Sequence, residues 1–97
     1  MDKNFWLKYQ AILKKHKIST KHAEWYMRWI KSFDKTLPNV PLPERIKEDI
    51  QAYMDILIRR NKYQDWQLEQ VNDALRLLFC EYLQLPWAKP WPVFINK

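Results

Sequence analysis

Glycine is absent from all 97 residues of this chain, and its absence narrows the folds open to the sequence. Tight β-hairpin turns, phosphate-cradling loops and the dinucleotide-binding fingerprint all depend on glycine. The single cysteine, Cys80, rules out an internal disulfide. The length suits one domain with a modest core, and 47% hydrophobic with 29% charged residues is an ordinary globular balance. These features predict one all-α domain.

Apolar side chains recur at helical spacing in four segments of the chain. These segments cover about residues 2–16, 20–35, 43–61 and 65–84. Asp2 and Ser19 are suitable caps for the first two helices, and Asp65 for the fourth. Prolines between residues 36 and 43 end the second helix, and Pro43 suits the first turn of the third. We therefore expect a compact four-helix bundle over residues 1–86.

The apolar stripes also predict which side chains are buried. We place His16 beside the stripe of the first helix as a packed histidine, and Ile46 on the stripe of the third. Leu77, Cys80 and Trp66 fall off the stripe of the fourth helix, which predicts spare apolar surface there. We expect seven residues to share one core: Phe5, Tyr26, Ile30, Ile50, Leu57, Leu75 and Phe79.

The C-terminal segment, residues 87–97, is rich in proline and tryptophan and cannot form a regular helix. We expect Trp87 to be anchored against the bundle and residues 90–97 to be a largely mobile linker.

The net charge of +6 is concentrated in the first third of the chain. Residues 1–37 hold nine Lys and Arg against three acids, whereas residues 38–97 hold eight of each. Much of the excess falls on one side of the second helix, at Lys21, Arg28, Lys31 and Lys35, with Glu24 as the only acid. The opposite side carries Ala23, Tyr26, Met27, Ile30 and Phe33. Such a helix can bury one face and offer the other to a polyanion, although a basic face is also often merely solvated.

The sequence gives little indication of catalysis. His16, His22 and Cys80 have no familiar metal-ligand spacing, and no serine or cysteine nucleophile signature is present. We expect no metal, no cofactor and no enzymatic activity from this chain alone. No apolar run approaches membrane-spanning length, so we expect a cytoplasmic protein without a membrane partner.

Two motif runs resemble the core-binding domain of tyrosine recombinases of the phage-integrase family. The first is Ile-Ser-Thr-Lys-His at residues 18–22, followed by Tyr26, Trp-Ile-Lys at 29–31, and Phe33. It is similar, without a gap, to the integron-integrase pattern Tyr-Ser-x-Arg-Thr, Tyr, Trp-Ile-Lys, Phe. The second is Ala-Leu at 74–75, Phe79, Glu-Tyr-Leu at 81–83 and Leu-Pro-Trp at 85–87. It is similar to the family's fourth helix and its exit.

The resemblance implies a four-helix, SAM-like domain that forms one jaw of a clamp around double-stranded DNA, with helices two and four facing it. It also implies that catalysis belongs to a C-terminal domain absent from this chain, and that sister protomers share the DNA. Ser19 and Lys21 match the family's backbone-contacting positions, and His22 replaces its Thr. Acids on helix four, Glu69 and Asp73, oppose phosphate contact there. The residues predicted to contact DNA are Lys17, Ser19, Lys21, His22, Arg28, Lys31, Lys35, Gln67, Gln70 and Arg76.

Two other functions remain open on the sequence. A helical protein-interaction module would use the apolar residues Leu77, Cys80, Trp87 and Trp91 as its contact surface. Peripheral membrane binding through the first helix ranks last, because the apolar residues of that helix are needed in the core.

Overall fold

The structure is a computed structural model that describes residues 2–95, and it confirms the all-α prediction. Four α-helices and no strand occur in these residues. They are α1 (Lys3–Lys15), α2 (Thr20–Lys35), α3 (Lys47–Arg60) and α4 (Asp65–Arg76). Three short elements accompany them: the 3₁₀ turns η1 (Leu42–Glu44) and η3 (Pro86–Ala88), and η2 (Leu77–Tyr82), a π-helical continuation of α4.

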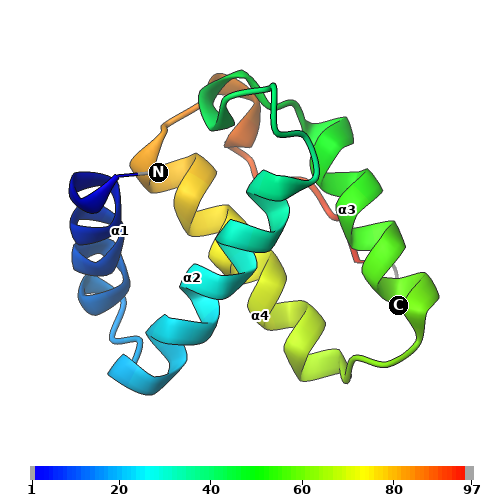
Figure 1. Cartoon of the computed structure of the whole chain (residues 1–97), viewed down its shortest axis with the longest axis horizontal. Coiled ribbons are helices and arrows are strands. Elements are labelled where there is room, and N and C mark those ends of the chain that lie inside the picture. The colour runs from blue at the N-terminus through cyan, green and yellow to red at the C-terminus, as the bar shows by residue number, and fades with distance from the viewer. Residues whose placement is uncertain (1, 96–97) are drawn as a thin grey trace.

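α2 crosses α4 at the centre of the molecule, with α1 and α3 on either side (Figure 1). The inner side of α2 buries Tyr26, Trp29, Ile30 and Phe33. Six of the seven predicted core residues are buried; the exception is Phe5, which is partly buried and packs against Tyr82 with ring centroids 4.9 Å apart. The apolar side of α2 therefore faces inward as predicted, which turns its charged side to solvent.

The first two helix caps are confirmed. The Asp2 carboxylate accepts a hydrogen bond from the amide of Phe5 at 2.9 Å, and the Ser19 hydroxyl oxygen accepts one from the amide of His22 at 3.2 Å. At the start of α4 the cap is Gln64, one residue before the predicted Asp65. Its amide donates to the side chain of Gln67 at 2.8 Å. The bonds to Asp2 and Ser19 each give a partner to a backbone amide that the first turn of a helix otherwise leaves unbonded.

The prediction that the third helix starts at Pro43 is wrong. The chain makes the short turn η1, becomes extended at Arg45 and Ile46, and enters α3 only at Lys47. Ile46 is the N-cap and is 50% exposed, so it does not lie in the core that the apolar stripe predicts for it. The break allows the Arg45 side chain to point inward.

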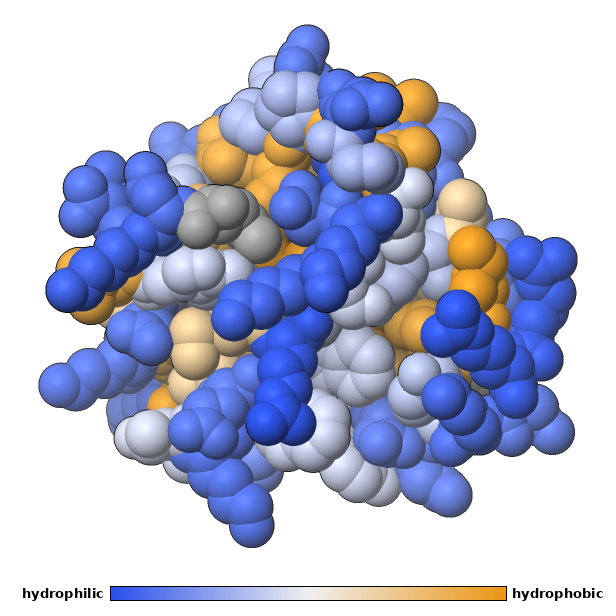
Figure 2. Space-filling view, in the orientation of Figure 1, coloured by the Kyte–Doolittle hydropathy of each residue, from blue (hydrophilic) through white to orange (hydrophobic). Residues whose placement is uncertain are grey.

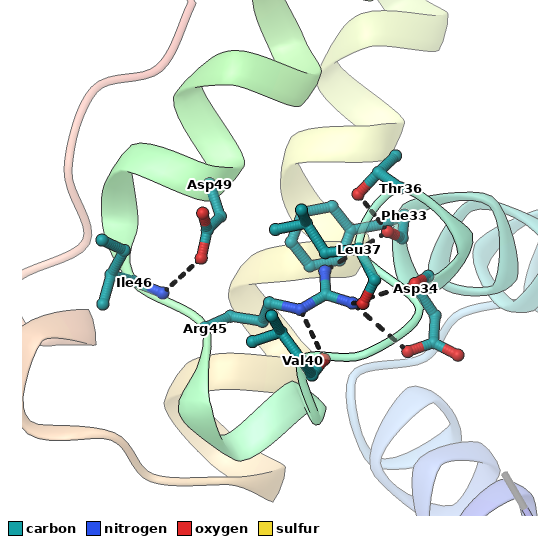
Figure 3. A network of polar contacts seen from close by, with 8 residues as sticks. All are labelled: Phe33, Asp34, Thr36, Leu37, Val40, Arg45, Ile46 and Asp49. Atoms are coloured by element: carbon teal, nitrogen blue, oxygen red, sulfur yellow. Dashed lines mark hydrogen bonds and ion pairs between the residues drawn. The ribbon is translucent and has the colours of Figure 1, made fainter.

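Arg45 is the one charged residue that is buried among the described residues, at 1% exposure. Figure 3 shows the polar contacts of its side chain. Its guanidinium donates to the carbonyl oxygens of Val40, Asp34 and Leu37 at 2.9 Å each, and to that of Phe33 at 3.3 Å. These carbonyls belong to the end of α2 and the loop after it, where helical partners are missing. Burial lowers the pKa of Arg45, and the nearby Asp34 and Asp49 carboxylates oppose that shift. Arg45 therefore closes the C-terminal end of α2.

Leu77 and Cys80 are buried, which corrects the prediction of spare apolar surface on the fourth helix. The wider turn of a π-helix changes the angular spacing of side chains, so residues 77–80 all enter the core. The Cys80 thiol donates to the carbonyl of Ala88 at 3.1 Å, and burial raises its pKa. Trp66 does remain 62% exposed, as its place off the stripe predicted.

The described part of the tail, which ends at residue 95, packs against the bundle where we expected a linker. Trp87 and Trp91 stack with ring centroids 5.9 Å apart, and Phe94 is only 4% exposed. The carbonyl of Phe94 accepts a bond from Gln51 of α3 at 3.2 Å. Apolar side chains of the tail thus pack against the bundle without forming a helix. The expectation for residues 96–97 lies outside the described residues.

Candidate nucleic-acid interface

The outward face of α2 carries the four cations predicted from its sequence. Lys21, Arg28, Lys31 and Lys35 are all exposed, and Figure 2 shows hydrophilic side chains across the middle of the molecule, over this helix. The ion pairs within residues 2–95 involve none of the four. Unpaired cations at one- and two-turn intervals form a positive stripe along the helix.

Two of these cations lie over aromatic rings. The Arg28 guanidinium is 4.9 Å from the centroid of Trp25, and the Lys31 ammonium is 5.2 Å from that of Trp6 on α1. A ring face attracts a cation without neutralising it, so both side chains are held in place and keep their charge. Glu24, the acid on this face, is also exposed.

The start of α2 gathers the other predicted contacts from this part of the chain. Lys17, Ser19 and His22 are all exposed around the joint between α1 and α2. Lys17 has a φ of 62°, in the left-handed region that glycine usually occupies. Because the chain has no glycine, a lysine adopts this conformation here. The Ser19 oxygen accepts the cap bond described above, which leaves the hydroxyl proton available to a ligand.

The predicted donors on α4 are instead engaged within the protein. The Gln70 side chain accepts a hydrogen bond from the indole of Trp29 at 3.0 Å, and that of Gln67 forms the cap of its own helix. Arg76 donates to the Asp73 carboxylate from two nitrogens, at 2.6 and 3.2 Å. Arg76 is therefore not a free donor beside the α2 stripe, whereas Gln67 and Gln70 are bound through their amide oxygens and keep their Nε2 hydrogens.

Asp73 is held from both sides. Its second oxygen accepts a hydrogen bond from the hydroxyl of Tyr26 at 2.7 Å, so one carboxylate joins α2 to Arg76. Burial and this bond raise the pKa of Tyr26 above its usual value. Burial alone would lower the pKa of Arg76, but the hydrogen bond and negative charge of Asp73, with smaller effects of Cys80 and Glu81, together raise it. The charges of Asp73 and Arg76 neutralise each other, and the network joins α2 to α4.

A groove of about 500 Å³ separates α2 from α3, and sequence reasoning did not identify it. Arg28, Lys31 and Lys35 line its α2 side, and Arg60 lies on the α3 side. Paler and apolar surface is visible between α2 and α3 in Figure 2. Arg60 follows Leu57 by three residues and Tyr53 by seven, a spacing that places it on the side of α3 nearest α2. That spacing is the signal that could have found it.

Across residues 2–95, His, Cys, Asp and Glu do not gather in a group of three or more that could hold a metal ion. His16 is exposed and so is not the packed histidine that we expected, but it does pair with Glu81 of η2. Among the described helices, none has the length and apolar character needed to cross a bilayer.

Comparison with known proteins found no family model, no curated protein and no solved structure that matches this chain.

Proposed function

We propose that this domain binds double-stranded DNA through the outward face of α2. The observation that carries the proposal is the stripe of four exposed cations, which have no acidic partner within the described residues. Phosphates along a duplex form a regular array of negative charge, and a rigid helix can oppose it with cations at fixed intervals. The interhelical bonds of Tyr26 and Trp29 support the proposal, because they fix the rotation of α2 about its axis.

Within this proposal, the chain is the core-binding domain of a tyrosine recombinase that takes part in DNA integration and recombination in the cytoplasm. This part of the proposal depends on the motif runs at residues 18–33 and 74–87. In that role the domain does not cleave DNA itself, because the catalytic residues belong to a separate C-terminal domain. It forms one jaw of a clamp, next to sister protomers on the same duplex.

The test is titration of a short labelled duplex with the protein at several salt concentrations. One jaw makes few contacts, so we expect an affinity of about 10⁻⁴ to 10⁻⁶ M in physiological salt. Lys21→Ala and Lys31→Ala should each reduce the slope of log affinity against log salt by about 0.9, the effect of one lost phosphate contact.

Lys47→Ala is the matched control, because Lys47 is exposed on the flank of α3 that faces the C-terminal segment. It should leave the slope unchanged. Binding that ignored salt and both α2 lysines would refute DNA binding through this face.

A further inference from the structure

The groove between α2 and α3 differs from the rest of the positive stripe in having two walls. Three cations come from α2 and one, Arg60, from α3, and no acid occurs among the described residues that line the groove. Like charges that face each other across a groove repel, and a bound anion relieves that repulsion. Arg60 thus extends the positive surface of α2 onto a second helix.

The hydroxyl groups that line the groove are arranged to favour a ligand that accepts hydrogen bonds. The Tyr53 hydroxyl donates to the Ser32 oxygen at 2.9 Å, so the Ser32 proton is left to donate elsewhere. Burial raises the pKa of Tyr53, which keeps this donor protonated at neutral pH. Thr36 is different, since its hydroxyl donates to the carbonyl of Phe33 at 2.6 Å. Ser32 is therefore the groove hydroxyl that can donate to a ligand.

We propose that this groove holds a backbone phosphate of nucleic acid, bound by Arg28, Lys35 and Arg60 with the hydroxyl of Ser32. A volume of about 500 Å³ accommodates a phosphate with its neighbouring sugar. This proposal rests on the proposed function, and it changes which helices form the DNA interface. The resemblance implies an interface built from helices two and four, whereas the free cations place it on α2 and α3.

Nucleic acid fits this groove better than an anionic membrane does. The groove continues a stripe of cations that runs along α2, which suits a linear polyanion. A membrane-binding helix needs a broad apolar face beside its cations. Here the apolar lining is limited to the exposed Ile56, the buried Leu57 and the ring of the buried Tyr53.

The test compares Arg60→Gln with Arg59→Gln. Both arginines are exposed in the last turn of α3, but Arg59 lines a separate hollow with Asp55 and Ile58. Loss of Arg60 should reduce the salt slope of duplex binding by about 0.9, and loss of Arg59 should not change it. Ser32→Ala should weaken binding severalfold at every salt concentration. Equal slopes for the two arginine variants would overturn the proposal.

Titration with inorganic phosphate separates this proposal from DNA binding in general. We expect the side-chain Nε–H NMR signals of Arg28 and Arg60 to shift with phosphate while that of Arg59 does not. If these signals shift but the wild-type domain does not bind duplex, the anion site stands and the DNA proposal fails. If the duplex binds but phosphate leaves Arg60 unaffected, the groove proposal fails alone. Binding to vesicles of phosphatidylserine and phosphatidylcholine that depended on Arg60 would identify a membrane partner instead of nucleic acid.

Discussion

The two sides of α2 differ in whether their polar side chains have a partner within the protein. On the inner side, Tyr26 and Trp29 each donate to a side chain of α4, and Arg45 closes the C-terminal end of the helix. On the outer side, Lys21 and Lys35 have no acidic partner within residues 2–95. Charge alone therefore does not identify a binding residue.

The difference separates stability from binding. A partnered cation such as Arg76 neutralises a carboxylate and helps to fix how two helices pack. An unpartnered, exposed cation contributes little to folding and keeps its charge for a ligand. Substitutions on the inner side should thus change the free energy of unfolding, and those on the outer side should change DNA binding.

The largest effect is expected for Arg45→Met. Removing the guanidinium leaves four carbonyls, buried or partly buried, without a donor. Each such unpaired group costs about 1 to 3 kcal/mol when buried, so we expect a total loss of about 3 to 5 kcal/mol. Chemical denaturation would measure it, with the exposed Arg59→Met as the control within about 0.5 kcal/mol. Equal unfolding free energies for the two variants would show that Arg45 is not needed to close α2.

A smaller effect is expected for Arg76→Ala. The Arg76 side chain is 38% exposed, so solvent screens its pair with Asp73, and the free energy of unfolding should fall by only about 1 kcal/mol. Because the pair is already neutralised, the salt slope of DNA binding should stay the same. A slope reduced by about 0.9 would mean that Arg76 leaves Asp73 to bind phosphate, which would restore α4 to the interface.

Local patterns predicted the helices and the burial of α2 well, because periodicity and capping depend on residues close in sequence. They failed where distant residues decide the outcome. The partners of Tyr26 and Trp29 lie 47 and 41 residues further along the chain, and nothing in the local sequence marks Gln70 or Asp73 as occupied.

Arg45 and the tail illustrate the same limit. A lone arginine in a proline-rich loop is normally solvated, and only the folded loop offers it buried carbonyls. The side chain of Phe94 is buried against a bundle whose shape the tail sequence does not encode. For the site, the α2 cations followed from helical spacing, whereas Arg60 required the relative placement of two helices.

The most direct test of the account is the salt slope of a variant that loses the whole stripe: Lys21→Gln, Arg28→Gln, Lys31→Gln and Lys35→Gln together. Four lost phosphate contacts should reduce the slope by about 3.6, taking about 0.9 for each. The unfolding midpoint should change little, because all four side chains are exposed. A folded variant with the wild-type slope would contradict the account, since the outward face of α2 would then be solvated surface and not an interface.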